Sequence, residues 1–414
     1  MTETAQNLAD LTAILAAARA GATLPADRVA ALALRYLASA PEGRGRIDPD
    51  AYRAELLSEF GGRFLHQGRD LDETQAGRML AAALRRAAVD IEDRTHFIPC
   101  RPWPDGSMAS LAVGPVNFRR TEAFRRSQTE ALTADPEFVA TVERDFAPWP
   151  FVAEVTVRGC DRVISRQRAL EAVDRALDLL RLFAGADSAR ALGRAGAPGP
   201  PILRPAGLWA DSKGRLHPVR AEAVGAGDPA EIAGRLRDRA GRAWLDGAGR
   251  SLQPLVDPAL NWPLAARFRE AVSWYGAALA ETSAAARIVD FVAAIERAVV
   301  AADHADIWRL VTQRASLLAA GAAREDQAGA AGDDAAEWLA RARAVYDCRS
   351  RIVHGGLSPF APEATSMAPD AERLARAVLR GVLPVYARIG LARAAVSADR
   401  LERAFDRLGD GARG

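Results

Sequence analysis

Residues 346–356 read Tyr346-Asp347-Cys348-Arg349-Ser350-Arg351-Ile352-Val353-His354-Gly355-Gly356 and describe the end of an amphipathic helix. Upstream of this segment, apolar residues recur at helical spacing on two adjoining faces, so most of the circumference is apolar. This pattern predicts a helix inside a bundle. The first face carries Trp338, Val345, Cys348 and Ile352, and the second carries Leu339, Ala342, Tyr346 and Val353.

The two ends of this helix have their own signals. Asp333 or Asp334 can cap the start, because a short carboxylate accepts hydrogen bonds from the first free N–H groups. Gly355 or Gly356 can adopt the left-handed conformation that ends a helix. We therefore expect His354 in the last turn of the helix.

His354 and Arg349 are the residues of this helix that can take part in chemistry. An imidazole titrates near neutrality, and a helix C-terminus favours its protonated form. Arg349 lies one turn earlier and carries a permanent positive charge on a forked donor set suited to phosphate. The pair therefore combines a proton-transfer group with an anion-binding group.

The arrangement Arg-x-x-x-x-His at a helix end resembles the signature of HEPN domains, and the pattern Tyr-x-x-Arg-Ser-x-Ile-Val-His-Gly resembles the Apea-like branch of that family. The likeness extends upstream, where residues 268–279 are similar to the first helix of that branch and residues 287–296 to its second. It covers roughly the last third of the chain. The resemblance implies a short helical bundle at the C-terminus.

The resemblance also implies a chemistry. Many HEPN domains are metal-independent endoribonucleases in which a histidine assists attack of the ribose 2′-OH on the adjacent phosphate and an arginine stabilises the transition state. His354 and Arg349 would have these roles. Positions five apart on a helix point about 140° from each other, so one helix does not align both groups. The resemblance implies a joint site formed by a pair of HEPN units. The expected supporting residues are Ser350, Asp290, Glu296 and Tyr346.

Other functions stay open at this point. Active HEPN members often carry Asn, Asp or His directly after the motif arginine, whereas this chain has Ser350, as Apea-like members often do. Arg349 and His354 could instead hold a bundle end or a dimer interface together, and Asp290 or Glu296 could form a structural ion pair with Arg349. The alternative function is a non-catalytic module that binds RNA or a nucleotide and uses the bundle for dimerisation.

The chain as a whole is expected to be mainly α-helical, with a small α+β domain in the middle and a C-terminal HEPN-type helical bundle. The predicted parts are a helical accessory domain, an α+β domain, a connecting segment and the bundle, at residues 1–95, 96–225, 226–258 and 259–414. The middle part is set apart by short β-branched runs and by the alternation from Phe151 to Arg158, which is typical of a half-buried strand.

The middle domain contains a basic cluster with two interleaved aromatic residues, Phe118 and Phe124. Arginines neutralise phosphates and rings stack on bases, so this cluster is a candidate surface for single-stranded nucleic acid. An Arg-rich composition makes a solvated face the alternative, because Lys213 is the only lysine of the chain. The candidate RNA-binding residues are Arg119, Arg120, Arg125, Arg126 and, next to the motif, Arg351.

Composition excludes several classes of protein. The chain has 414 residues and a net charge of +2, so RNA contacts must be local and not driven by a bulk field. No apolar run approaches the roughly 18 residues of a membrane span and the N-terminus lacks signal-peptide features, so we expect a cytoplasmic protein without membrane contact.

The three cysteines are expected to be reduced, with Cys348 in the core. No metal-binding, P-loop or dinucleotide motif occurs, and no cofactor or metal is predicted. The expected partners are RNA and a second copy of the chain, in bacterial phage defence or a toxin system.

Overall fold

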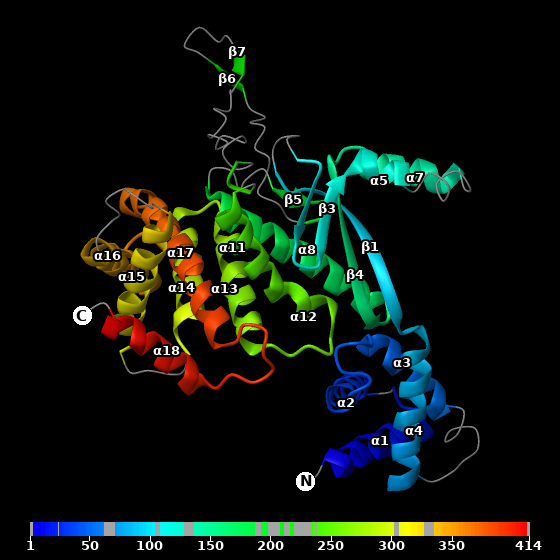
Figure 1. The fold of residues 1–414 in the computed structure, drawn as a ribbon. Coiled ribbons are helices and arrows are strands. Elements are labelled where there is room, and N and C mark those ends of the chain that lie inside the picture. The colour runs from blue at the N-terminus through cyan, green and yellow to red at the C-terminus, as the bar shows by residue number, and fades with distance from the viewer. Residues whose placement is uncertain are drawn as a thin grey trace. The chain divides into compact units, whose positions relative to one another are not determined.

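The computed structural model has the predicted fold class: it is mainly α-helical, with a small sheet in the middle and helices at the C-terminus (Figure 1). It describes residues 3–23, 25–61, 71–103, 108–127, 136–186, 192–197, 208–210, 216–218, 234–236, 238–301, 306–326 and 335–411.

The chain folds into two compact units. Unit 1 contains residues 1–96, 156–170 and 255–259, and unit 2 contains residues 97–155, 171–254 and 260–414. The strands β1 (Glu92–Arg101) and β4 (Phe151–Cys160) and the helix α8 (Arg162–Ala184) each contribute residues to both units. The predicted division at residues 95, 225 and 258 concerns independently folding parts and stays a prediction.

Unit 1 is built mainly from four helices around one apolar core. Residues such as Leu11, Tyr52 and Met79 are buried in this core. Helical spacing predicts a buried stripe through Val29, Leu32, Leu34 and Leu37, but Leu34 is 55% exposed, because the buried face of that helix runs through Val29, Leu32, Ala33 and Leu37. The helices are α1 (Glu3–Arg19), α2 (Ala26–Ser39), α3 (Pro49–Phe60) and α4 (Glu73–Ala87), and the 3-10 helix η2 (Ala88–Asp90) follows.

The start of α8 differs from what the sequence suggests. Ser165 is a residue type that favours helix caps, but the Asp161 carboxylate accepts the N–H of Ile164 at 2.8 Å and caps the helix instead. Ser165 lies inside the helix, fully buried, with its hydroxyl 2.7 Å from Nε2 of His96.

Unit 2 contains the sheet, whose strand order is β2-β3-β4-β1-β5. The segment 111–118 forms a hairpin, in which Leu111 pairs with Phe118 and Val113 with Val116. Gly114 has a φ of +57° at this turn. The remaining bounds of the sheet are β2 (Ser110–Val113), β3 (Val116–Arg120) and β5 (Gly193–Arg194), the last in a segment that was predicted to be a loop. Two short strands, β6 (Leu208–Ala210) and β7 (Leu216–Pro218), form a separate antiparallel pair.

The C-terminal helices of unit 2 form the predicted bundle, and α14 packs against four of them (Figure 1). The predicted apolar stripes are buried, from Phe268 and Tyr275 on the first helix to Phe291 and Ile295 on the second. The helices of unit 2 outside α8 are α5 (Thr121–Ser127), α7 (Pro136–Phe146), α11 (Arg239–Gly249), α13 (Pro263–Ala280), α14 (Ala284–Val299), α15 (Ile307–Asp326), α16 (Ala335–Val353), α17 (Pro362–Ile389) and α18 (Ala398–Gly411); η3 (Arg250–Leu252) and α12 (Gln253–Val256) lie between α11 and α13.

One helix of the bundle is longer than the sequence suggests. The Gly/Ala/acid composition after Leu318 predicts a linker, but α15 continues to Asp326 because Ala319, Ala320 and Ala322 are buried against its neighbours. Alanine has the highest helix propensity, which favours this extension. The helix α17 spans 28 residues and includes Pro369 and Pro384.

A close contact joins α8 to α13 within unit 2. The Asp178 carboxylate of α8 is buried and forms ion pairs with Arg181 at 2.6 Å and Arg175 at 2.9 Å. It lies against the backbone of Gly276 on α13, where an added Cβ would come 2.1 Å from Oδ1 of Asp178. Burial raises the pKa of the Asp178 carboxyl, and the two arginines oppose that effect.

No helix in the described part of the chain has both the length and the apolar character needed to cross a bilayer.

We predict that Gly276→Ala destabilises unit 2 by roughly 1–3 kcal/mol, because the methyl group would displace the buried carboxylate or push the two helices apart. Urea or thermal unfolding followed by circular dichroism measures the change. Gly321→Ala in α15 is the matched control, since a Cβ there meets no atom within 4 Å. The control should be neutral or more stable by about 0.5–1 kcal/mol, the usual gain from Gly to Ala in a helix. Equal stability of the two variants would contradict the proposed contact.

Candidate active site

The motif helix α16 ends as predicted, at a glycine. Gly355 has a φ of +75°, and its N–H donates to the carbonyl of Ile352 at 3.2 Å. The N–H of His354 still donates to the carbonyl of Ser350 at 3.0 Å, although the helix itself ends at Val353. His354 is therefore the first residue past the helix, held in position by its backbone. The predicted caps, Asp333 and Asp334, lie outside the described residues.

The burial of α16 follows the first predicted face more closely than the second. Trp338, Ala342, Val345 and Cys348 are buried, which confirms Cys348 as a core residue. Burial raises the pKa of the Cys348 thiol, so its reactive thiolate form is disfavoured. The second face was expected to be buried along its length, but it opens to solvent toward the helix end, where Val353 is 51% exposed.

Arg349 points from α16 toward Glu296 on α14. Its Nη2 lies 3.7 Å from Oε2 of Glu296, and the guanidinium carbon lies 5.8 Å from the centre of the Tyr346 ring. The Tyr346 hydroxyl donates to Oε1 of the same glutamate at 3.0 Å. One carboxylate thus holds both side chains, and Nε of Arg349 is buried and donates no hydrogen bond to a described residue.

Burial raises the pKa of Tyr346 to about 12, and the negative charge of Glu296 adds to the shift. The phenol is therefore a hydrogen-bond donor at neutral pH, and its described acceptor is the carboxylate of Glu296. Of the two acidic residues expected to orient Arg349, only Glu296 contacts it. The Asp290 side chain forms no hydrogen bond or ion pair with a described residue. Burial, and to a lesser extent repulsion from Glu281, raises the pKa of its carboxyl.

His354 has different surroundings. Its side chain is exposed, and no described residue forms a hydrogen bond or ion pair with it. Large apolar side chains nearby in the sequence are also exposed, namely Val353 at 51% and Phe360 at 93%. The imidazole is therefore accessible to a ligand or a partner, whereas Arg349 is held in the contact between α14 and α16. Ser350 directly follows Arg349 in the sequence and is half-buried. Its carbonyl accepts the hydrogen bond from the N–H of His354.

The basic cluster of the middle segment does not form the predicted stacking surface. Phe118 and Phe124 are buried, so their rings are not available to bases. Arg119 pairs with Glu154 at 3.1 Å and lies over the rings of Phe97 and Phe124. Of the other arginines, Arg120 lies over the ring of Phe151, Arg125 pairs with Glu143 at 2.5 Å, and Arg126 is exposed. Next to the motif, Arg351 pairs with Glu363 at 2.7 Å.

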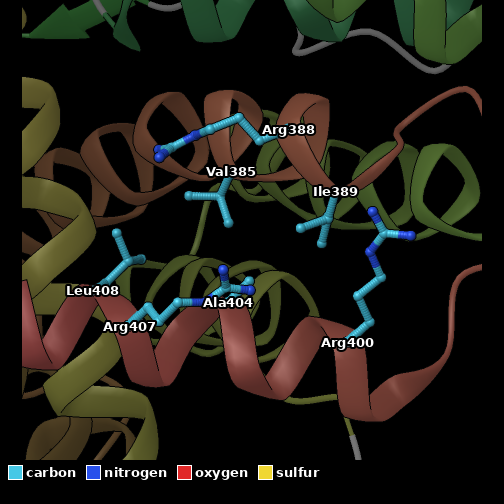
Figure 2. A pocket seen from close by; sticks show the side chains of 7 residues that line it. All are labelled: Val385, Arg388, Ile389, Arg400, Ala404, Arg407 and Leu408. Carbon is cyan, nitrogen blue, oxygen red and sulfur yellow. The ribbon is translucent and has the colours of Figure 1, made fainter.

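Sequence reasoning missed a cavity between α17 and α18. It has a volume of about 270 Å³ and is lined by Arg388, Arg400 and Arg407 together with aliphatic side chains (Figure 2). The signal in the sequence was the spacing of Arg400 and Arg407, seven residues apart and thus on one face of α18. Among the described residues, no group of three or more His, Cys, Asp or Glu side chains is arranged to hold a metal ion.

Comparison with protein-family models, with curated proteins and with solved structures found no match to this chain. The likeness to HEPN domains therefore rests on the motif and its helical context.

We predict that Tyr346→Phe destabilises the protein by about 1 kcal/mol. The change removes a hydrogen bond to a charged group, a type of bond that contributes roughly 1.5–3 kcal/mol when fully buried and less at a half-buried site. The effect should be smaller when Glu296 has already been changed to Gln, because the charged acceptor is then missing. A double-mutant cycle by urea unfolding gives the coupling free energy. A second cycle with Glu270→Gln, whose carboxylate pairs with Arg297, should show additive effects. Additivity in both cycles would contradict the described contact.

Proposed function

We propose that the C-terminal bundle is an Apea-like HEPN domain and that the chain is a metal-independent endoribonuclease of the cytoplasm. The observation that carries the proposal is the exposed His354 at the glycine-terminated end of a bundle helix, five residues after an arginine with an unsatisfied Nε donor. The resemblance of residues 268–279 and 287–296 supports the proposal. The first segment lies in α13 and the second in α14; α14 packs against the motif helix α16, and α13 packs against α14.

In this proposal His354 accepts the proton of a ribose 2′-OH. The 2′-oxygen attacks the adjacent phosphorus, the bond from phosphorus to the 5′-oxygen breaks, and the leaving 5′-oxygen takes up a proton. The products are a 2′,3′-cyclic phosphate and a 5′-hydroxyl end. Arg349 donates to a non-bridging oxygen, where negative charge develops in the transition state. The Arg349 side chain is 26% exposed, so a phosphate can approach part of it, although its Nε is buried.

Arg349 and His354 have different surroundings, which supports a site shared between two copies of the chain. Arg349 faces α14, whereas His354 extends from the helix end. A symmetric dimer through this end of α16 would bring two such pairs to one cleft. The exposed Val353 and Phe360 are suited to such a contact, because large apolar side chains gain most from being covered. Cleavage of host or phage RNA in a defence or toxin system is the corresponding biological role.

A second candidate function is a non-catalytic module that binds RNA or a nucleotide and dimerises through the bundle. The contact of Glu296 with both Arg349 and Tyr346 favours it, because this arrangement is also what a structural ion pair requires. An RNA gel separates the two candidates: retarded but intact RNA supports binding alone, and shortened RNA supports cleavage.

We predict that His354→Ala lowers RNA cleavage by on the order of 10²-fold or more, since it removes the proton-transfer group. Arg349→Ala should have an effect of similar size by removing the charge stabiliser. Cleavage of labelled RNA measures both rates, and the products should end in 2′,3′-cyclic phosphate with and without EDTA. Folding, followed by circular dichroism, should persist in both variants.

Cys348→Ala is the matched control for this experiment. It changes a neighbouring residue of the same helix, which is buried and has no role in the proposed chemistry. We expect cleavage to be largely retained at a cost in stability of about 1 kcal/mol or more. Undiminished cleavage by a well-folded His354→Ala protein would assign the activity to another site or to a contaminant, and RNA left intact by the wild type would favour the binding module.

We predict a homodimer at tens of micromolar, measured by light scattering after size-exclusion chromatography. Phe360→Arg should weaken it by about tenfold or more, because a buried charge without a partner opposes association. Val89→Arg, at an 84% exposed position in unit 1, is the control and should leave the dimer unchanged. A monomeric wild type that still cleaves RNA would rule out the shared site.

A further inference from the structure

The cavity between α17 and α18 combines positive charge with an apolar wall. Figure 2 shows Val385 and Ile389 extending from α17 toward α18, with Leu408 and Arg400 projecting from α18 beside them. Arg388 and Arg407 also line the cavity, and the guanidinium groups of the three arginines lie apart from one another in Figure 2. The volume of the cavity is about 270 Å³, close to the roughly 300 Å³ at which pockets for drug-sized ligands begin. The cavity is therefore of a size for a small molecule.

The three arginines have no acidic partner among the described residues. Nε of Arg388 donates to the carbonyl of Pro384 at 3.4 Å, and Nε of Arg407 donates to the carbonyl of Arg403 at 3.1 Å, each within its own helix. The side chain of Arg400 has no hydrogen bond or ion pair with a described residue. Most donor groups of three guanidinium ions are thus available to a ligand that carries negative charge.

Several arginines elsewhere in unit 2 form ion pairs. Arg297 pairs with Glu270, and Arg341 pairs with Asp370 at 3.2 Å. Another cavity, of about 430 Å³, is also lined by arginines, but Arg194 there binds Asp174 at 2.7 Å. The cavity between α17 and α18 differs from that one, because no described carboxylate pairs with its arginines.

The charges of α18 are sorted between two faces. Glu402 and Asp406 lie on the side of α15, where both approach Arg314. Arg400 and Arg407 lie on the side of the cavity. This sorting directs the acidic residues to a structural ion pair and leaves the cavity positive. A folded positive cavity of this kind costs electrostatic free energy, which a bound anion would offset.

We propose that this cavity binds a nucleoside monophosphate or a closely similar small phosphorylated ligand. The guanidinium groups match the phosphate, since their forked donors bind its oxygens in pairs. The aliphatic side chains would contact the face of the base, whereas inorganic phosphate or a sugar phosphate would leave them in water. The site is separate from Arg349 and His354, and the inference does not depend on ribonuclease activity.

The test is isothermal titration of the full chain with AMP, GMP, CMP and UMP, with adenosine and inorganic phosphate as partial ligands. We expect at least one nucleotide to bind more tightly than either partial ligand. Arg400→Ala and Arg407→Ala should each weaken its binding by about tenfold or more, because each removes a charge-assisted contact with phosphate.

Arg403→Ala is the matched control. Arg403 is an exposed arginine on the same helix, but it does not line the cavity. Its Nε donates to the carbonyl four residues earlier, that of Asp399, at 3.2 Å, and Nε of Arg407 donates in the same way to the carbonyl of Arg403. Its affinity for the nucleotide should equal that of the wild type, and circular dichroism should show that all three variants are folded.

Four results would overturn the proposal: binding of no nucleotide at millimolar concentration, equal loss in the Arg403→Ala control, inorganic phosphate binding as tightly as the nucleotides, or retention of affinity in both cavity variants. Binding of single-stranded RNA through Arg400 and Arg407 without binding of any mononucleotide would assign the cavity to RNA instead. Because no variant alters Arg349 or His354, a failure here is independent of the cleavage experiment.

Discussion

The C-terminal bundle depends on the burial of α14. This helix packs against α13, α15, α16 and α17, and apolar side chains fill most of its surface. Full burial of one large apolar side chain contributes roughly 1.5–3 kcal/mol, so residues such as Phe291 and Ile295 hold the neighbouring helices together. Tyr386 of α17 adds a hydrogen bond, since its hydroxyl donates to the carbonyl of Ala298 at 2.6 Å. Glu296 is a polar residue through which α14 contacts the motif helix.

The position of Glu296 determines what Arg349 can do. One oxygen of its carboxylate accepts a hydrogen bond from the Tyr346 hydroxyl, and the other forms an ion pair with Arg349. This contact restrains the guanidinium and leaves Nε as its unsatisfied donor. The same geometry fits a structural contact and the proposed catalytic one, and the two differ in whether a phosphate reaches the exposed part of the Arg349 side chain. The exposure of His354 is what makes the catalytic function worth proposing, because a histidine with a purely structural role would be expected to have a partner.

Much of the architecture could be predicted from periodicity. The apolar stripes of α13 and α14, the strand alternation of β4 and the helix end at Gly355 each rest on local rules of spacing or backbone conformation. The errors concern tertiary context. Leu34 fits a helical stripe but lies on its solvent side, and Ser165 fits a cap but is one residue type among two candidates. Asp290 and Glu296 are six residues apart and point about 120° from each other on a helix, so only one could face Arg349. Which one does depends on how α14 is rotated against α16, and local patterns do not determine that rotation.

The contact between Asp178 and Gly276 has a consequence for how relatives of this chain would vary. A side chain at position 276 and a carboxylate at position 178 compete for the same space, so the two positions are expected to change together. A relative with alanine or serine at the first position should carry a smaller or uncharged residue at the second. Its arginines at positions 175 and 181 would then lack their acidic partner and should be replaced as well. This co-variation would distinguish chains in which α8 docks on the bundle from chains that share only the bundle itself.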